Sequence, residues 1–242
     1  MKIFGFKTNS ENRFINITCN IILGAIVLVV FSLSIFSPVI SVGSVPTQKA
    51  VYNGNKNKNN ISLMINVYWG DEYLDSMLNT LKQNNVKCTF FVGGCWVARN
   101  NEMLLKFLNA GHEIGNHGYN HKDHAKLNAK QNQEEINTTT ELVEAITGYK
   151  MNLFAPPSGS YNDSVLNVAS SLGYKTIMWS KDTIDWRDKD EDLIFKRATE
   201  KASNGDLILM HPTEKTSLVL DKIIKTLKQK GFNLTTVSEN LM

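Results

Sequence analysis

The sequence contains few cysteines and prolines, and these absences narrow the classes of protein to consider. Of 242 residues only three are cysteine and five are proline. Three cysteines allow at most one intrachain pair, and no C-x-x-C spacing is present, which excludes a disulfide scaffold and a structural zinc site. We expect Cys88, which lies in an apolar strand-like run, to be a buried and reduced thiol.

The region after residue 60 lacks a surplus of basic charge. The formal net charge is +3, but residues 1–60 contain six basic residues and one acidic residue, which leaves 20 basic and 22 acidic residues in the remainder. A nucleic-acid-binding domain would need a basic stripe on its folded part. No nucleic-acid partner is therefore expected.

Residues 20–42 form an uncharged apolar segment, preceded by Lys2, Lys7 and Arg13. Its roughly 20 apolar residues are enough to span a bilayer as a helix, whereas a cleaved signal has a shorter apolar region. We favour an uncleaved transmembrane anchor, and the small residues Ser41-Val42-Gly43 leave a cleaved signal segment open. The positive flank predicts a cytoplasmic N-terminus at residues 1–19 and a domain outside the cell membrane, or secreted after cleavage.

The stretch from residue 43 to 60 is predicted to be a flexible linker. Residues 53–59, GNKNKNN, are polar and without apolar periodicity. Residues 61–242 are expected to form one folded domain, because the 42% of hydrophobic residues in the chain is enough to bury a sizeable core.

Seven apolar runs with strand character alternate with amphipathic stretches in this domain. They lie at residues 62–68, 87–93, 112–116, 152–156, 175–180, 206–211 and 233–237. Strands separated by helices pair in parallel through right-handed crossovers, as a barrel or as an open doubly wound sheet. We favour an α/β fold of the (β/α) barrel type, because polar residues gather directly after the strands, where barrels place their active sites.

Histidines follow two of these runs. His117 and His121 lie four residues apart in NHGYNH. Imidazoles from one short loop supply half of a zinc-type site, but two do not complete it. His211 ends another run and Asp185 follows a third, and a histidine backed by a carboxylate is a candidate general acid. A capping histidine with a surface aspartate is the alternative for this pair.

Five motifs in a fixed order resemble the polysaccharide deacetylases of carbohydrate esterase family 4, the NodB homology domain. They are VKCTFFVGG, GHEIGNHGYNH, FAPPSGSYN, DTIDW and LILMHP. The resemblance covers roughly residues 60–240 and implies a distorted (β/α) barrel of seven to eight strands, here preceded by the transmembrane or signal helix. The segments NVYWGDEYL and KTIMWSKDTIDW are most similar to the sporulation-associated branch.

The resemblance implies metal-dependent hydrolysis of N-acetyl groups on a polysaccharide such as peptidoglycan of a cell wall or spore cortex. In the family a divalent metal, usually zinc, activates water and is held by an aspartate and two histidines, which His117 and His121 match. His211 matches the acid that protonates the leaving amine, and Asp185 matches the residue that tunes it. The substrate pocket is matched by Trp186, Leu209, Tyr68 and Pro156.

The chain departs from the family at the T-F-D-D-G motif, where it reads Asn66-Val67-Tyr68-Trp69-Gly70. Tyr68 stands at the position of the general base and Trp69 at that of the metal aspartate. Ala155 replaces the arginine that orients the base, and Ser158 replaces an aromatic residue. Base and arginine are lost together, which is self-consistent because the arginine alone would be a buried unpaired charge.

Two residues are candidate substitute ligands. Asp71 follows Gly70, whose permissive backbone could turn the carboxylate inward. His124 extends the histidine motif to a third imidazole, although a solvated loop position is the favoured expectation for it. Losing a general base typically lowers the rate by about 10² to 10⁴. The sequence therefore predicts a deacetylase of reduced activity, with a non-catalytic glycan-binding or scaffold protein on the same fold as the alternative.

Overall fold

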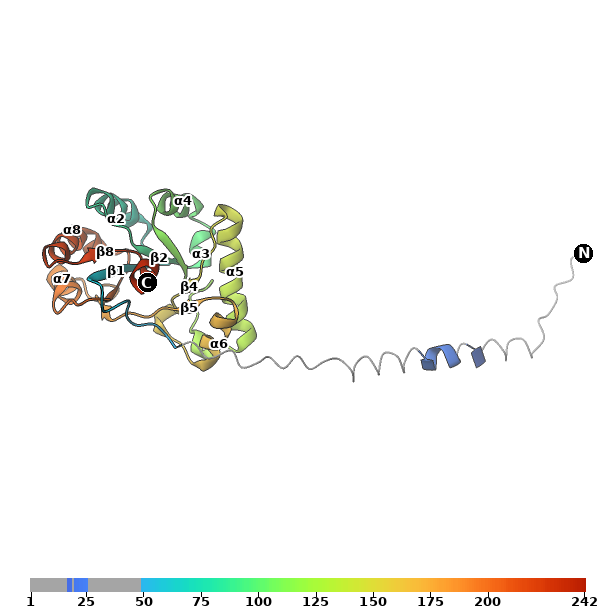
Figure 1. Ribbon diagram of the computed structural model, residues 1–242. Coiled ribbons are helices and arrows are strands. Elements are labelled where there is room, and N and C mark those ends of the chain that lie inside the picture. The colour runs from blue at the N-terminus through green and yellow to red at the C-terminus, as the bar shows by residue number, and fades with distance from the viewer. Residues whose placement is uncertain (1–16, 19, 26–48) are drawn as a thin grey trace, which may run out of the picture. The chain divides into compact units, whose positions relative to one another are not determined.

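Parallel strands form the centre of the domain, and helices lie around their outside (Figure 1). The computed structural model describes residues 17, 18, 20–25 and 49–242. The strands are β1 (Asn60–Val67), β2 (Thr89–Val92), β3 (Glu113–Asn116), β4 (Leu153–Phe154), β5 (Lys175–Thr176), β6 (Lys181–Asp182), β7 (Leu207–Met210) and β8 (Asn233–Leu234). All seven predicted strands are present, all but β1 shorter than the apolar runs, and β6 is an eighth.

The strand order β5-β4-β3-β2-β1-β7-β6 defines a curled sheet in which neighbouring strands are parallel, and β8 pairs with the start of β1. Within the described residues β5 and β6 end this path without pairing to each other. The expected distorted (β/α) barrel of seven to eight strands is thus confirmed, with its ring open between these two strands.

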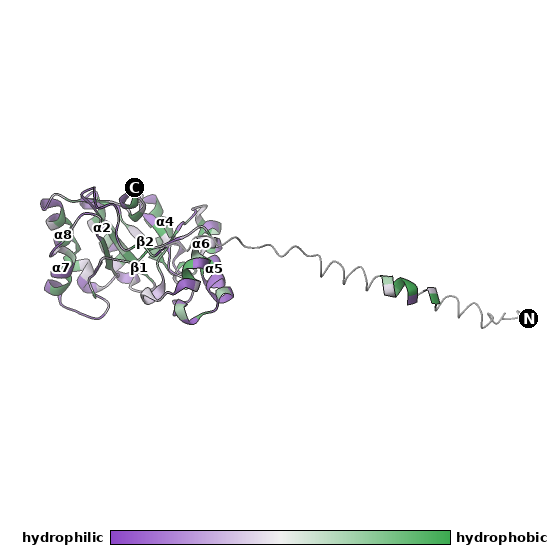
Figure 2. Cartoon of the chain, turned by 60° about the horizontal axis from the view of Figure 1, so that its bottom comes forward, coloured by the Kyte–Doolittle hydropathy of each residue, from purple (hydrophilic) through white to green (hydrophobic). Residues whose placement is uncertain are grey.

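Helices lie between most successive strands and cover the outer face of the sheet, and the last helix follows β8 and contributes Val237 to the core inside the barrel. The helices are α2 (Asp71–Gln83), α3 (Gly94–Val97), α4 (Asn101–Asn109), α5 (Ala129–Thr147), α6 (Asp163–Ser171), α7 (Glu191–Thr199), α8 (Glu214–Gln229) and α9 (Val237–Leu241), with the 3₁₀ turns η1 (His124–Lys126) and η2 (Pro157–Gly159). Hydrophobic residues concentrate on the central strands and hydrophilic ones mostly at the periphery (Figure 2).

Alternation along β1 separates two apolar cores. Ile61, Leu63, Ile65 and Val67 belong to the large core between strands and helices, whereas Met64 belongs to a smaller core inside the barrel. Successive side chains of a strand point to opposite faces, so the even-numbered residues of β1 face the interior. Asn66 follows Met64 on this inner face, at the carboxyl end of the strand.

Residues 51–59 correct the predicted flexible linker. Val51 forms a parallel bridge with Ile177, and the backbone N–H of Gly54 donates to the carbonyl of Gly205. The amide of Asn59 donates to the carbonyl of Gly231. Glycine and asparagine residues of this segment are held by hydrogen bonds and not by the burial of apolar side chains. Hydrophobic periodicity therefore does not reveal that the segment is part of the domain.

The chain divides into two units, residues 1–43 and 44–242. Most of the predicted membrane segment, residues 20–42, lies outside the described residues. The described residues of the first unit, 17, 18 and 20–25, are helical. Within the described part of the chain, no helix combines the length and apolar character that crossing a bilayer requires.

Candidate active site

A cavity of about 580 Å³ opens at the carboxyl ends of the strands. Its lining comes from the ends of β1, β3, β6 and β7 and from the loops after β4 and β5. The lining residues are Asn66, Tyr68, Trp69, His117, His121, Ser158, Trp179, Asp182, Trp186, Leu209 and His211. This is the face where barrel enzymes hold their active sites, as predicted from the residues that follow each strand.

His117 is held in a defined tautomer directly after β3. Its side chain is buried, and its Nδ1–H donates to the carbonyl oxygen of Ala155 over 2.7 Å. A carbonyl only accepts, so Nδ1 carries the proton and the lone pair lies on Nε2. Burial lowers the pKa of His117 to about 3, with the neighbouring His121 adding to the effect. The imidazole is therefore neutral at pH 7 and able to act as a ligand.

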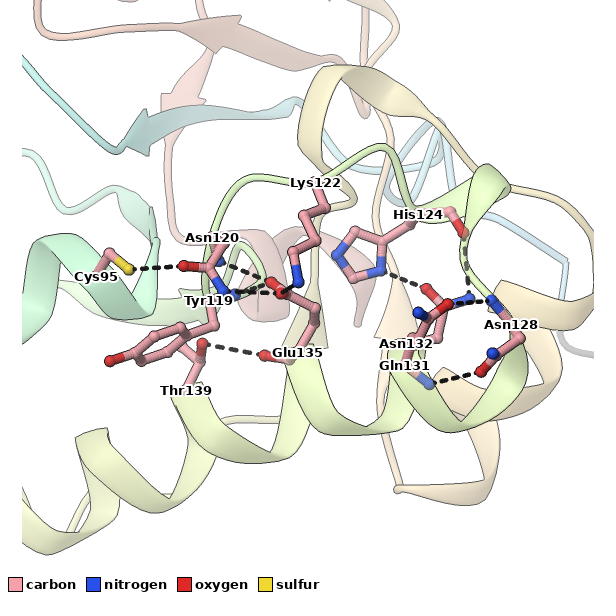
Figure 3. Close-up of polar contacts among 10 residues, drawn as sticks. All are labelled: Cys95, Tyr119, Asn120, Lys122, His124, Asn128, Gln131, Asn132, Glu135 and Thr139. Atoms are coloured by element: carbon pink, nitrogen blue, oxygen red, sulfur yellow. Dashed lines mark hydrogen bonds and ion pairs between the residues drawn. The ribbon is translucent and has the colours of Figure 1, made fainter.

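His121 lies beside His117 with 5.1 Å between the ring centroids, and its backbone has a φ of 54°, which is unusual for a residue other than glycine. We call residues 117–124 the histidine loop. Glu135 of α5 holds it, because its carboxylate accepts hydrogen bonds from the backbone N–H groups of Tyr119 and Asn120 (Figure 3). These contacts compensate the strained turn at His121.

Burial of Glu135 acts to raise its pKa, but hydrogen bonds from Asn120, Lys122 and Tyr119 outweigh it and bring the pKa below the ordinary value. The carboxylate is thus charged at neutral pH, and it is 2.9 Å from the Lys122 ammonium group. A charged acceptor of several N–H groups makes stronger hydrogen bonds than a neutral one. Glu135 therefore positions the loop that carries the two histidines.

The predicted contact between His211 and Asp185 is present. Nδ1 of His211 is 2.8 Å from Oδ1 of Asp185, and the backbone N–H of His211 donates to Oδ2 over 2.7 Å. The hydroxyl of Thr216 donates to the same Oδ2 over 2.5 Å. Three donors thus hold the buried carboxylate of Asp185. Because Nδ1 of His211 makes the contact with Asp185, Nε2 is the ring nitrogen that remains for the cavity. Asp185 is buried, which removes the surface-aspartate alternative.

Tyr68 and Trp69 each lie against a histidine of the site. The ring of Tyr68 is 5.0 Å from that of His121, and the ring of Trp69 is nearly parallel to that of His211 at 5.9 Å. Burial raises the pKa of Tyr68, with Cys95 adding to the rise, so the phenol stays protonated at neutral pH. Tyr68 cannot replace a carboxylate base.

The structure separates both candidate substitute ligands from the cavity. Gly70 has the left-handed φ of 83°, but the carboxylate of Asp71 accepts a hydrogen bond from the indole of Trp96 and does not line the cavity. His124 is fully buried, with Nδ1 2.7 Å from the side-chain oxygen of Asn132. The expected solvated position of His124 is wrong, because η1 turns the ring into the core beside α5.

Three of the four predicted pocket residues line the cavity and one does not. Tyr68, Trp186 and Leu209 line the cavity, whereas Pro156 is buried and Ser158 lines the cavity in its place. The predicted buried state of Cys88 is confirmed, and it is a free thiol.

Four lining residues were not predicted: Asn66, Ser158, Trp179 and Asp182. Each lies at or just after a predicted strand, which is the signal that could have identified them. Asp182 is the cavity's carboxylate among the described residues, and one of its oxygens accepts the backbone N–H of Ile184 over 2.8 Å. The mouth of the cavity is rich in aromatic rings, with Trp69 and Trp186 largely exposed.

The residues present do not fit a catalytic zinc ion. His117 and His121 supply two imidazoles, and no group of three or more His, Cys, Asp or Glu side chains in the described part of the chain is arranged to hold a metal. Catalytic zinc sites have three protein ligands. Trp69 stands where the family has its metal-binding aspartate, and the carboxylate of Asp71 does not line the cavity. Neither residue therefore supplies a third ligand.

The chain is similar in sequence to proteins of several Bacillus species. It is 43% identical over 189 residues to the uncharacterized protein YlxY of Bacillus subtilis, covering 78% of this chain and 59% of YlxY. It is 32% identical over 191 residues to a peptidoglycan-N-acetylglucosamine deacetylase of Bacillus cereus, covering 77% of this chain and 70% of that enzyme. The chain thus spans less than two thirds of the length of YlxY.

Solved structures show the same architecture. A CE4 family pseudoenzyme from Bacillus anthracis matches with a TM-score of 0.79 and 38% identity, covering 81% of this chain and 69% of that one. A mutant of that pseudoenzyme, described as having restored enzymatic activity, matches with a TM-score of 0.79 and 37% identity, covering 81% and 72%. The family model for polysaccharide deacetylase matches residues 53–177. The chain belongs to the polysaccharide deacetylase family.

Proposed function

We propose that this domain binds an N-acetylated glycan of the peptidoglycan class in the cavity and hydrolyses its N-acetyl groups slowly. The observation that carries the proposal is the intact pair of His211 and Asp185, which opens into the same cavity as the aromatic side chains at its mouth. Aromatic rings stack on sugar rings, and relatives in the family are named as peptidoglycan deacetylases.

His211 acts in this proposal as the proton donor to the leaving amine. Asp185 holds its Nδ1–H and stabilises the charged imidazolium, and Thr216 together with the His211 backbone compensates the carboxylate. The attacking water has no carboxylate base at Tyr68 or Trp69, so the proton that it loses on attacking the carbonyl passes to solvent water. A missing base lowers the rate by about 10² to 10⁴, so slow hydrolysis is expected.

The second candidate is a non-catalytic glycan-binding protein on the same fold. It is favoured by the aromatic rings against the site, since Tyr68 covers His121 and Trp69 lies over His211. A structural neighbour at 38% identity is described as a pseudoenzyme. In this alternative the cavity keeps its shape for sugar and has no hydrolytic role.

Acetate release from N-acetylglucosamine oligomers and from peptidoglycan separates the two candidates. The wild-type chain should release acetate slowly but faster than the variant His211→Ala, which removes the acid. Asp185→Asn should lower the rate as well, because it loses the charge that stabilises the imidazolium. Equal release by wild type and His211→Ala would refute hydrolysis and leave glycan binding as the function.

We further propose that residues 20–42 attach the domain to the cell membrane with its N-terminus in the cytoplasm, and that His117 and His121 bind zinc only weakly, because they are two of the three protein ligands that a catalytic zinc site needs. Uncharged residues 20–42 after Lys2, Lys7 and Arg13 support the topology. Protease added to intact cells should remove the domain. A soluble domain in the medium that begins near residue 44 would instead indicate a cleaved signal.

The motif sequence also supports a role in sporulation, with the spore cortex as one source of the glycan. The supporting segments are NVYWGDEYL and KTIMWSKDTIDW. Deleting the gene should then change the acetylation of cortex peptidoglycan, measured by mass spectrometry of digested glycan. Unchanged cortex with a changed vegetative cell wall would place the function outside sporulation.

A further inference from the structure

Asp182 carries a negative charge that its local structure does not require. Its side chain lines the cavity, and its Oδ1 accepts the backbone N–H of Ile184 over 2.8 Å. This turn holds Ile184 at a φ of 54°. An asparagine would hold the turn equally well, because the turn needs one acceptor oxygen and no charge. The second oxygen and the charge of Asp182 are therefore available to a ligand.

No lysine or arginine of the described residues lines the cavity to compensate this carboxylate. The nearby guanidinium group of Arg187 is bound to Asp188, with Nε 2.8 Å from Oδ1 and Nη2 3.1 Å from Oδ2. Asp188 raises the pKa of Arg187 through this contact, and Asp182 adds to the rise only to a smaller extent. Arg197 is also bound to Asp188. Asp182 is thus left as the charge that faces the cavity.

The sheet places Asp182 beside His211. Asp182 pairs with Leu209 in the register of β6 and β7, and His211 follows Leu209 by two residues, which puts it on the same face. Adjacent strands lie about 4.8 Å apart and two residues span about 6.6 Å, so the Cα atoms of Asp182 and His211 are about 8 Å apart. Both side chains line the cavity. One bound nitrogen atom can therefore contact both side chains.

These two side chains suit an ammonium group. Nδ1 of His211 makes the contact with Asp185, so Nε2 of the neutral ring offers a lone pair. An ammonium group has three N–H donors and a positive charge, which match this lone pair and the free oxygen of Asp182. Three of the lining residues are tryptophan, and the faces of aromatic rings attract cations. An acetamido nitrogen has one N–H and no charge, so it leaves the charge of Asp182 uncompensated.

We propose that Asp182 and His211 form a subsite for the ammonium group of an amino sugar, and that the cavity retains de-N-acetylated glycan in preference to N-acetylated glycan. This inference rests on the proposed glycan binding and adds to it the state of the glycan that is bound most tightly. The class of reaction that supplies this ligand is N-deacetylation. The slow hydrolysis proposed above produces such a sugar in the cavity itself, and a more active deacetylase produces it elsewhere on the same glycan.

The test compares three tetrasaccharides of the same linkage that differ at one carbon of each sugar ring. They are the tetramers of glucosamine, N-acetylglucosamine and glucose, which carry an ammonium, an acetamido and a hydroxyl group there. Binding is measured by isothermal titration calorimetry on the full chain in detergent at neutral pH, with EDTA present to keep metal from His117 and His121. Wild type should bind the glucosamine tetramer about tenfold more tightly than either other tetramer, the value of one hydrogen bond to a charged group.

Asp182→Asn keeps the acceptor for the N–H of Ile184 and removes the charge. Its affinity for the glucosamine tetramer should fall about tenfold, and its affinities for the two uncharged tetramers should stay as in wild type. Asp190→Asn is the matched control. Oδ1 of Asp190 also accepts the backbone N–H of the residue two positions further on, Asp192, but Asp190 does not line the cavity. This control removes the same charge and should change no affinity.

Equal loss of affinity for all three tetramers in Asp182→Asn would assign Asp182 to a group that the sugars share, and would overturn the inference while glycan binding stands. Wild-type binding of the N-acetylated tetramer that is as tight as that of the glucosamine tetramer would overturn it in the same way, as would an equal loss in Asp190→Asn. Failure of wild type to bind any tetramer would overturn the proposed function together with this inference. Should Asp182→Asn not fold, Asp182→Ser, which also supplies an acceptor oxygen to the turn, must show the same selective loss.

Discussion

Restoring the family residues at three positions should convert the slow site into an active one. The change is Tyr68→Asp, Trp69→Asp and Ala155→Arg, which supplies a base, a third metal ligand and the arginine that orients the base. His117 and His121 already lie together on the cavity wall, and the acid half needs no change. The expected gain in acetate release is about 10² or more, the lower bound for a positioned base.

The structure locates the risk of this experiment at Ala155. Trp69 is 44% exposed and Tyr68 is partly exposed, so truncating them costs less than the roughly 3 to 5 kcal/mol of a fully buried aromatic residue. Ala155 is 0% exposed and packs inside the barrel. Ala155→Arg alone should lower the free energy of unfolding by about 3 to 5 kcal/mol, because its charge is buried without a partner. Tyr68→Asp should recover part of this loss by supplying the carboxylate.

The assay has three readouts: circular dichroism for folding, zinc content after dialysis, and acetate release from N-acetylglucosamine oligomers. Trp69→Asp alone should raise zinc affinity with little gain in rate, since a ligand without a base supplies only part of the reduction of the barrier. A folded triple variant that binds zinc tightly and releases no acetate would refute the reasoning. The binding-protein alternative would then be preferred.

Three further outcomes are expected. Wild type should bind zinc weakly in equilibrium dialysis, and His117→Ala should not bind it, because one of the two imidazole ligands is lost. The control His124→Ala should bind as much zinc as wild type. Equal zinc content in all three proteins would contradict a site made of His117 and His121. Burial lowers the pKa of His112 to about 4, with Lys87 adding to the shift, and its Nδ1 accepts the backbone N–H of Cys88. The unfolded chain therefore binds the extra proton, so stability should be full above about pH 6.5 and fall towards pH 4. His112→Gln should make this fall in the chemical-denaturation profile smaller, while His117, whose pKa is lowered to about 3, continues to contribute to it. Glu135→Ala should lower the free energy of unfolding by about 2 to 5 kcal/mol, because two backbone N–H groups of the histidine loop lose their acceptor; a loss below about 1 kcal/mol would contradict its positioning role.

Much of the fold follows from local sequence. The seven apolar runs identify seven strands because a strand buried on both faces needs nearly continuous apolar residues. The strand β6 (Lys181–Asp182) is not apparent, since its two residues are charged and polar and pair only through their backbones with β7. The helix α5 lacks clear apolar periodicity because Asn132, Glu135 and Thr139 lie on its buried face. Those polar side chains bind the histidine loop and the helix backbone, which only the folded arrangement makes favourable.

For the site, residue type and order alone identify the strand ends at which functional groups lie and the positions at which this chain departs from its family, among them the loss of carboxylates at Tyr68 and Trp69. The pairing of His211 with Asp185 was one of two alternatives until the fold showed Asp185 buried against the imidazole. Only packing between distant elements determines where the remaining side chains point. Asp71 turns away because the Trp96 indole offers its carboxylate a donor.

His124 and Asn66 illustrate the same limit. Asn132 of α5 holds the ring of His124 in the core, and Asn66 of β1 lines the cavity together with Leu209 of β7. These partners are distant in the chain. Hydrogen-bonding and burial depend on which groups meet after folding, whereas residue type and periodicity describe only a segment on its own. The sequence therefore specifies the barrel and its catalytic face, and the packing of distant elements specifies the chemistry that the face presents.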